Sequence, residues 1–288
     1  MKKRLFFLRI VFGLSFLFSA YTKFIVPGYF EITLMDQGLV NNRLAAAQWA
    51  RFFIGMEMAL GILFLTPYYT RKLSLFSFFI LVVFTGHLIF LHVKGVTENC
   101  GCFGEMISMT PLESIFKNGF LLSIALLLYF YSKQKGKFYW VLIVSAFFIG
   151  SMWVFLPIQK PEDLSFQSYT SFENKGRVDL NAGEKVIAVF NLDCEHCQET
   201  ASKMARLKNS SKDFPQTFVL YYKEGASTVE SFEKKTGFSA PYTFIDVNTF
   251  FDLIGNSPPR LYYLKNGKTV HVWDDNFVTN IKKQMDSR

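Results

Sequence analysis

Five long apolar segments fill the first half of this 288-residue chain and restrict its fold more than any other feature. They run from about Ile10 to Tyr21 (with apolar Leu5 to Leu8 in front), Phe52 to Tyr69, Leu73 to Leu91, Ile115 to Tyr131 and Tyr139 to Leu156. Each is close to the ~20 residues that an α-helix needs to cross a bilayer. We therefore expect an all-α bundle of five helices in a lipid bilayer.

The first segment follows a basic N-terminus and contains Arg9, which lies near enough to the end of the segment to reach the headgroups. A cleaved signal peptide has the same basic start. However, the apolar stretch is long, no Ala-x-Ala site follows it, and further spans come after it. We interpret this segment as an uncleaved first span.

The formal net charge of +8 belongs entirely to the apolar half, because Lys and Arg equal Asp and Glu after residue 157. Basic residues in short loops mark the cytoplasmic side of a membrane protein. Eight lie at the N-terminus and in the second and fourth connections: Lys2, Lys3, Arg4, Arg71, Lys72, Lys133, Lys135 and Lys137. We predict a cytoplasmic N-terminus in a bacterial inner membrane. The segment from Lys23 to Arg51, the loop around Glu98 to Glu113 and everything after Pro157 are then exoplasmic or periplasmic. Topology explains the charge, so we expect no nucleic-acid partner.

The composition changes after residue 157 to Gln, Pro, Ser, Asn and Glu, which predicts a tether over 158–183. A soluble domain follows over 184–288. The pattern predicts strands at 186–192 and 217–222, a helix at 195–207 between them, short helices at 229–235 and 248–254, a hairpin over 261–273 and a last helix at 277–285. Strand, helix, strand implies a parallel sheet in an α/β domain.

Cys194-Glu195-His196-Cys197 stands where the first strand ends and the helix begins. The positive end of a helix and its free N–H groups favour a thiolate; a protonated His196 would add to this effect and Glu195 would oppose it. We therefore expect Cys194 to be the nucleophile and Cys197 the thiol that resolves a mixed disulfide. The alternatives are a structural disulfide, or half of a zinc site that needs two further ligands. We expect no metal.

Ser257-Pro258-Pro259 precedes the hairpin, whose turn is Asn266-Gly267. With the cysteine motif, this arrangement resembles the thioredoxin-like fold, in which a loop ending in a cis-proline faces Cys-x-x-Cys. The resemblance covers residues 184–288 and implies that Pro259 is cis and that the residue before it offers backbone groups to a bound peptide. It departs at Leu192-Asp193, where thioredoxins carry Trp-Cys. A surface turn is the alternative.

Cys100-Gly101-Cys102-Phe103-Gly104 follows the third span on the side predicted for Cys194. A disulfide between residues two apart closes a small, strained ring and should be easily reduced, and the glycine eases its closure. Two reduced interfacial thiols or a metal site are the alternatives. The predicted topology favours redox pairing, because it places both cysteine pairs on one side and leaves no cysteine over.

Residues 1–132 also resemble the DoxX/MauE-like four-helix membrane family. The resemblance rests on Arg9 and Gly13 in the first span, Lys23 at its end, Arg51 to Gly61 with Glu57 in the second, and the Cys-Gly-Cys-Phe-Gly motif. The segment 133–157 is then a fifth, additional span. The MauE branch is associated with methylamine utilisation, where the resemblance implies maturation of a disulfide-rich dehydrogenase subunit.

Ionisable residues inside spans are rare and mostly face the bundle interior. Glu57 lies in the second span, and His87 and His92 lie in and at the end of the third. Glu57 is expected to pair with Arg51 or a histidine, or to relay a proton; a structural ion pair is an equal alternative. We interpret the many Phe residues as lipid-facing or packing residues, with a quinone pocket as the lesser alternative.

These observations predict a membrane-bound thiol–disulfide oxidoreductase with no covalently bound cofactor. Cys194 and Cys197 would exchange disulfides with exported cysteine-containing proteins and with Cys100 and Cys102. His196, Ser257, Pro259, Glu57 and His87 would support this chemistry. Because no cysteine lies on the cytoplasmic side to receive electrons, oxidation of exported proteins is favoured over reduction. The alternative is a MauE-like assembly or maturation factor whose redox activity is secondary.

Overall fold

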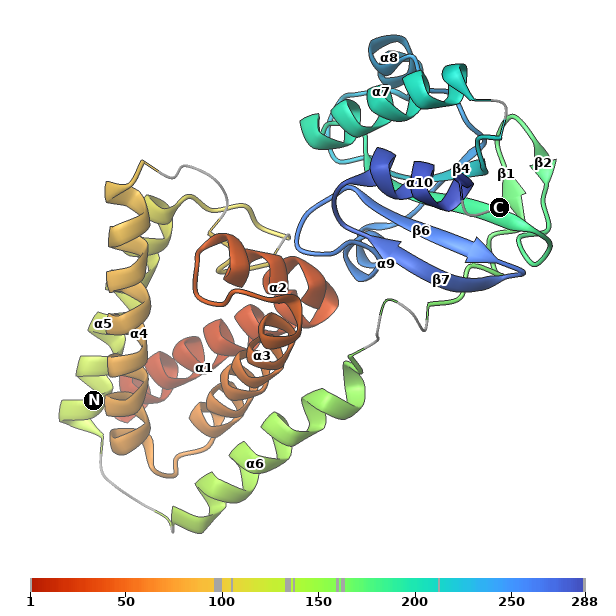
Figure 1. Cartoon of the computed structure of the whole chain (residues 1–288). Helices are drawn as coiled ribbons and strands as arrows, with labels where there is room; N and C mark the ends of the chain where they lie inside the picture. Colours follow the sequence, from red (N-terminus) through yellow and green to blue (C-terminus); the bar gives the residue numbers. More distant parts are fainter. Residues whose placement is uncertain are drawn as a thin grey trace. The chain divides into compact units, whose positions relative to one another are not determined.

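The computed structural model describes residues 2–95, 100–104, 106–132, 136, 138–158, 161, 164–211 and 213–286. The chain divides into two compact units, Met1–Ile158 and Gln159–Arg288, and each is described by itself. The first unit is built of helices and the second combines strands with helices (Figure 1).

The helices of the first unit are α1 (Lys2–Ile25), α2 (Pro27–Asp36), α3 (Arg43–Leu65), α4 (Thr70–Val93), α5 (Pro111–Tyr131) and α6 (Phe138–Phe155). Within the described residues, five of them, all except α2, are long and apolar enough to cross a membrane. The predicted helical membrane bundle is confirmed. The chain is a multi-pass membrane protein whose first unit lies in the lipid bilayer.

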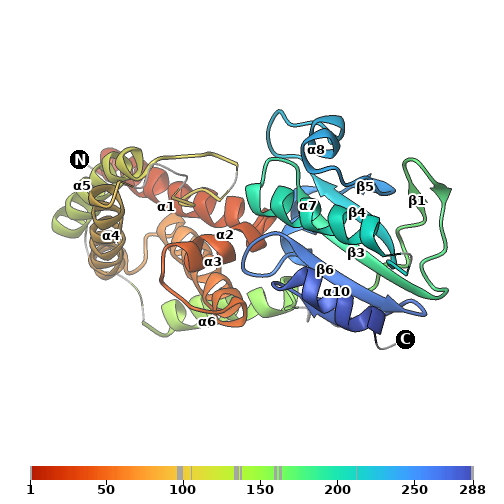
Figure 2. The ribbon, with the colours of Figure 1, turned by 45° about the horizontal axis from the view of Figure 1, so that its top comes forward.

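Glycines allow α3 to approach both α1 and α6 closely. A Cβ atom on Gly61 of α3 would lie 2.5 Å from Leu17 Cγ of α1, and one on Gly13 of α1 would lie 2.9 Å from the Gly61 carbonyl oxygen. A Cβ atom on Gly55 would lie 2.6 Å from the Cα atom of Ile149 on α6. Small residues at such crossings let membrane helices pack backbone to backbone. α3 packs against both α1 and α6, and Figure 2 shows it between them.

The segment from Lys23 to Arg51, expected to be an exterior loop, is largely helical: α2 fills its middle and the first turns of α3 fill its end. Phe30 and Leu34 of α2 are buried, and Glu31 between them is buried as well. The carboxylate of Glu31 tolerates burial because the Arg51 guanidinium lies 2.5 Å from it. Hydropathy could not reveal α2, since ten residues that include two acidic side chains are too short and too polar to be recognised as a span.

Some of the residues on which the orientation prediction depends lie outside the described residues: Lys133, Lys135, Lys137 and Glu98. The same holds for the side chain of Lys2. The cytoplasmic placement of the N-terminus therefore stays a prediction from the charge pattern.

In the described part of the second unit, five strands form one mixed sheet in the order β5-β4-β3-β6-β7. They are β3 (Glu184–Asn191), β4 (Gln216–Tyr222), β5 (Tyr242–Phe244), β6 (Arg260–Lys265) and β7 (Lys268–Trp273). β3, β4 and β5 are parallel, whereas β6 is antiparallel to β3 and β7 to β6. The predicted parallel pair is present, and the Asn266-Gly267 turn joins β6 to β7. The sheet is that of a thioredoxin-like α/β domain.

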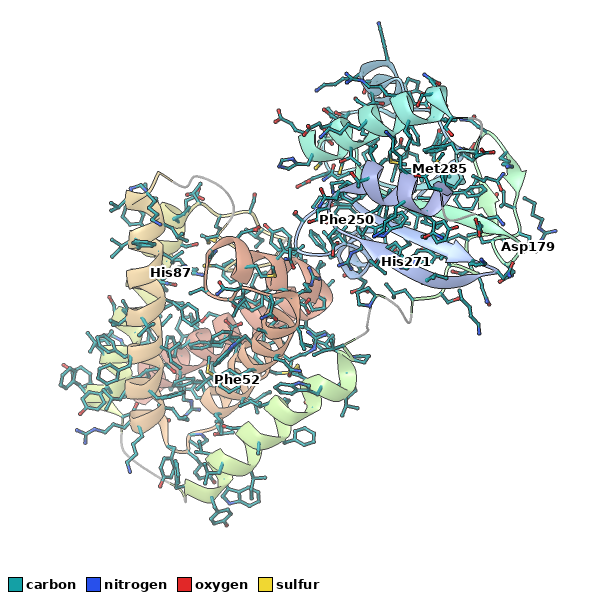
Figure 3. All side chains as sticks on the ribbon, viewed as in Figure 1. Phe52, His87, Asp179, Phe250, His271 and Met285 are labelled. Carbon is teal, nitrogen blue, oxygen red and sulfur yellow. The ribbon has the colours of Figure 1, made fainter. Side chains whose placement is uncertain are left out.

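Helices cover both faces of this sheet. They are α7 (Glu195–Ser210), α8 (Val229–Thr236) and α10 (Phe277–Asp286) on one face and α9 (Val247–Leu253) on the other. Phe250 of α9, labelled in Figure 3, stacks on Tyr222 of β4 with ring centroids 4.5 Å apart. β3 is a continuous apolar run, rather than an alternating one, because both of its faces are buried.

The segment 158–183, predicted to be a tether, is partly built into the second unit. The ring of Phe166 is 1% exposed and lies 4.8 Å from that of Tyr262, and the Phe172 ring lies 4.7 Å from that of Phe218. Strands β1 (Ser171–Phe172) and β2 (Gly176–Arg177) pair with each other here. Single aromatic anchors among polar residues carry no periodic signal, so composition alone places the start of the folded unit too late.

Phe166→Ala should destabilise the second unit by about 3 kcal/mol, because truncation of a buried Phe loses its packing and leaves a cavity. Phe244→Ala is the matched control, since Phe244 is 52% exposed. Urea-dependent alkylation of the fully buried Cys197 in the full-length protein, read by mass spectrometry, reports the unfolding. Equal midpoints for the two variants would show that Phe166 does not anchor the segment.

Candidate active site

Cys194 lies at the N-cap of α7, and the Cys197 backbone N–H donates to its sulfur at 3.3 Å. The turn that leads from β3 to this cap is held by Asp193, whose carboxylate accepts from the backbone N–H groups of Gly225 at 2.8 Å and Ser227 at 3.3 Å. Cys194 is half-buried, whereas Cys197 is completely buried one turn further into the helix. One thiol is thus accessible and the other sits behind it.

The surroundings of the two sulfurs push their pKa values apart. A hydrogen bond from the Cys197 thiol, helped by the backbone N–H groups of Cys197 and His196 and by the charge of His196, lowers the pKa of Cys194 to about 6. Burial raises the pKa of Cys197. At neutral pH Cys194 is therefore a thiolate and Cys197 a protonated thiol, which are the states required of a nucleophile and a resolving thiol.

The loop before β6 faces Cys194. The Pro258–Pro259 peptide bond is cis, as the resemblance implied for Pro259, and the Pro258 carbonyl oxygen lies 3.9 Å from the Cys194 sulfur. His196, Ser257 and both prolines line one side of a cavity of about 450 Å³, and the beginning of α10 lines the other. Cys194 is not part of this lining, but the cavity begins at its neighbours, His196 in the same helix turn and Pro258, whose carbonyl oxygen contacts its sulfur.

The second cysteine pair lies in the connection between α4 and α5. Cys100 is buried; its backbone N–H donates to the Met109 carbonyl at 2.9 Å and its sulfur lies 2.9 Å from Ser114 Oγ. Cys102 is partly exposed. All four cysteines of the chain are free thiols in this structure.

Both glycines of the Cys-Gly-Cys-Phe-Gly motif are required by the geometry of this loop. Gly101 has φ +69°, and a Cβ atom there would lie 2.6 Å from Thr33 Cγ2 of α2. Gly104 has φ +57°, and its Cβ atom would lie 3.0 Å from the Thr22 carbonyl oxygen of α1. Only glycine combines this backbone conformation with such close approach, so the motif seats the loop directly on α1 and α2.

The pKa values of Cys100 and Cys102 are also pushed apart, as they are for Cys194 and Cys197. A hydrogen bond from the Cys100 thiol and the positive charge of Lys117 lower the pKa of Cys102 to about 5, against the opposing effect of burial. The same hydrogen bond, together with burial, raises the pKa of Cys100. Cys102 is therefore the thiolate and Cys100 the protonated partner.

Lys23 connects this loop to the helices. Its Nζ donates to both carboxylate oxygens of Glu57 at 2.9 and 3.0 Å, to Ser19 Oγ at 2.6 Å and to the Cys102 carbonyl oxygen at 2.9 Å. Glu57 forms an ion pair, as the structural alternative expected, but its partner is Lys23. The expected pairing with Arg51 or a histidine is wrong, because Arg51 binds Glu31. Lys23 was noted in the sequence only as the end of the first span, and nothing there indicated its partner across the bundle.

His87 reaches the same loop through Gln37. Gln37 Nε2 donates to the Cys100 carbonyl oxygen at 2.9 Å, and its Oε1 lies 3.1 Å from His87 Nε2. Because Oε1 can only accept, His87 must carry its proton on Nε2. Sequence reasoning found His87, which is labelled in Figure 3, but missed Gln37 because α2 itself was missed. His92 lies at the C-terminal end of α4.

Lys23, Glu57, Gln37, His87 and both cysteines line one cavity of about 270 Å³ inside the helical unit. No group of three or more His, Cys, Asp or Glu side chains able to hold a metal ion occurs among the residues that the structure describes. The predicted site residues thus fall into two places: Cys100, Cys102, Glu57 and His87 in the membrane unit, and Cys194, Cys197, His196, Ser257 and Pro259 in the other.

Comparison with known proteins agrees with this division. Residues 1–131 match the family model described as methylamine utilisation protein MauE. The membrane unit contains a MauE-like domain. Protein TlpB of Flavobacterium psychrophilum is 28% identical over 327 aligned positions, which cover 91% of this chain and 89% of TlpB. The similarity therefore extends beyond the MauE-like domain into the thioredoxin-like part, and the predicted two-part architecture is confirmed.

The pH dependence of Cys194 alkylation checks the first site. In a Cys100→Ala/Cys102→Ala background, the rate with iodoacetamide should be half-maximal near pH 6 and fall as the pH drops below that value. An ordinary cysteine titrates at about 8.5. Cys197→Ala should move the midpoint upward because it removes the strongest hydrogen bond, and His196→Ala should move it less. A wild-type midpoint near the ordinary value would refute the assignment of Cys194 as the thiolate.

Variants of Lys23 check the second site. Lys23→Met should destabilise the MauE-like domain by about 3–5 kcal/mol, because it leaves the Glu57 carboxylate without its buried partner. Lys23→Met/Glu57→Gln should recover much of that loss, and the exposed Lys94→Met should be neutral. Thermal unfolding and the alkylation rate of Cys100 in detergent measure these effects. No recovery in the double variant would mean that the pair is not coupled.

Proposed function

We propose that the protein is a membrane-bound thiol–disulfide oxidoreductase that oxidises exported proteins. The observation that carries the proposal is that both cysteine pairs combine one thiol of low pKa with one of high pKa. In each pair one sulfur is held as a thiolate and the other as a buried thiol. A structural disulfide has no need of such a difference, whereas an exchange reaction requires an attacking and a resolving thiol.

In the first step the Cys194–Cys197 disulfide takes two electrons from an exported dithiol. The S–S bond between Cys194 and Cys197 breaks, an S–S bond forms in the exported protein, and both cysteines of the pair become thiols. The groove lined by Ser257, Pro258 and Pro259 would hold the exported chain as an extended segment.

In the second step Cys194 attacks a Cys100–Cys102 disulfide, and Cys197 then resolves the mixed disulfide. The S–S bond is restored between Cys194 and Cys197, while Cys100 and Cys102 take up the two electrons. The predicted topology puts both pairs on the exoplasmic side. Both pairs belong to one chain, so the step is intramolecular, and joining two sites in one chain can raise their effective concentration to about millimolar.

The match to the methylamine utilisation family favours a second candidate, an assembly or maturation factor. In that case the MauE-like domain would dock one client, and the thiol chemistry would be secondary. Cys194→Ala/Cys197→Ala distinguishes the two functions in cells that depend on the protein. The oxidoreductase loses client oxidation in this variant, whereas a docking factor keeps client maturation.

A resolving-thiol variant tests the relay itself. Cys197→Ser should trap a mixed disulfide between Cys194 and Cys100 or Cys102, because the thiol that normally releases it is missing. Non-reducing electrophoresis with peptide mapping identifies the linkage, and Cys197→Ser/Cys100→Ala/Cys102→Ala is the matched control. If Cys194 forms mixed disulfides only with other proteins, the relay between the two pairs does not occur.

A further inference from the structure

The cavity beside Cys100 and Cys102 has the lining of a small-molecule site. Aromatic side chains form much of its wall: Phe16, Phe30, Phe53, Phe84, Phe103 and Phe120. Polar groups are few and gathered near the cysteines, with the Lys23–Glu57 pair, the His87–Gln37 pair and Lys117 among them. An apolar wall with a few placed polar groups is typical of a site for a flat, mainly apolar ligand.

A second cavity of about 610 Å³ adjoins the first and gives it an opening toward lipid. The two share lining residues, including Leu39, Met56, Ile80 and His87. The second is lined by apolar side chains of α3 and α4 that are exposed on the outside of the bundle, such as Trp49 and Val83. In a membrane protein, such a surface faces lipid tails. A ligand with a ring in the first cavity and an apolar tail in the second would enter from the bilayer.

Lys117 is placed to bind an electron-rich oxygen of such a ligand. It lines the cavity, its Nζ lies 4.3 Å from the centre of the Phe103 ring, and its charge acts on Cys102. An ammonium group in the lining of a cavity stabilises negative charge that develops on a bound carbonyl oxygen.

We propose that this cavity binds a lipid-soluble quinone, which accepts the electrons of Cys100 and Cys102. This inference rests on the proposed function, because it names where the electrons of the relay go. The chain has four cysteines, all of them in the two pairs, so an acceptor outside the chain is required. A fatty acid or phospholipid would fill the same apolar space but cannot accept electrons.

The reaction balances as a two-electron, two-proton transfer. Two thiols are oxidised as one S–S bond forms between Cys100 and Cys102, and the quinone is reduced to the hydroquinone. One proton comes from the Cys100 thiol. The second, which Cys102 releases on ionisation, reaches the other ring oxygen through the polar groups of the cavity, where Lys117 is the donor next to Cys102.

Purified full-length Cys194→Ala/Cys197→Ala protein in nanodiscs isolates this step from the thioredoxin-like part. The protein is reduced, desalted and mixed with decylubiquinone or a short-chain menaquinone, whose fully substituted quinone rings leave no position for thiol addition. Quinol absorbance and alkylation of Cys100 and Cys102 are followed together. One quinol per disulfide formed is expected, and none from the further variant that also lacks Cys100 and Cys102. Thiol oxidation without quinol, or quinol without these cysteines, would overturn the proposal.

Steric variants locate the site. Ile80→Trp and Leu39→Trp should slow quinone reduction at least about tenfold, since both residues line the two cavities. Val82→Trp is the control, because Val82 is on the same helix and points outside both cavities. Leu39 is 48% exposed, so its replacement keeps the test valid if Ile80→Trp fails to fold. Equal rates of quinone reduction in all three variants would contradict quinone binding in this cavity. Lipid would then be its occupant.

Lys117→Met supplies a second, chemical test. It should slow oxidation by decylubiquinone more than oxidation by cystamine, because only the quinone uses the ammonium group as a donor. Lys94→Met is matched to it, since Lys94 also lies over a phenylalanine ring, at 4.4 Å, but does not line the cavity. If Lys117→Met slows oxidation by decylubiquinone and by cystamine equally, Lys117 does not act on the quinone. If quinone reduction is normal but Cys197→Ser traps no disulfide between Cys194 and Cys100 or Cys102, the relay is overturned and the quinone site is not.

Discussion

The Lys23 ammonium group is the interaction on which the membrane unit depends. It is 3% exposed, neutralises Glu57 of α3 and binds the Cys102 carbonyl, so one buried charge ties α1, α3 and the cysteine loop together. A buried ion pair stabilises a fold only when its remaining hydrogen bonds are satisfied, and here Ser19 and the loop carbonyl satisfy them. If the loop moved away, the buried Lys23 ammonium group would lose the hydrogen bond to the Cys102 carbonyl. The same ion pair that joins α1 to α3 therefore helps to fix the position of the cysteines.

The two cysteine sites reach the same chemical state mainly by the same means, a hydrogen bond from the buried second thiol to the sulfur that ionises. The additional contributions differ. Backbone N–H groups at the start of α7 add to the effect at Cys194, whereas the charge of Lys117 adds to it at Cys102. Both sites leave the second thiol buried and protonated. Two sites with the same division of roles can exchange a disulfide in either direction, and the proposed quinone acceptor beside Cys100 and Cys102 would set the direction.

The parts of the fold that rest on strong periodic signals were predictable from the sequence. The five spans, β3 and β4, and the helix after Cys194 follow from apolar runs whose length or spacing admits one interpretation. Elements held by a few tertiary contacts were not. Helix α2 depends on Glu31 meeting Arg51, which lies 20 residues away, and the anchoring of 164–183 depends on two phenylalanines. The cysteines of the site were evident from their spacing, whereas Lys23, Gln37 and Lys117 are recognisable only once three helices bring them to one cavity.

In the proposed relay, Cys100 and Cys102 control the redox state of Cys194 and Cys197, and this control can be measured in cells. Acid quenching of cells followed by mass-tagged alkylation measures the fraction of each pair that is oxidised. Both pairs should be mostly oxidised during growth, and both should become reduced when quinone synthesis is blocked. In Cys100→Ala/Cys102→Ala cells, the Cys194–Cys197 pair should be reduced whether or not quinone is present. A Cys194–Cys197 pair that stays oxidised in that variant would show that Cys100 and Cys102 do not control it.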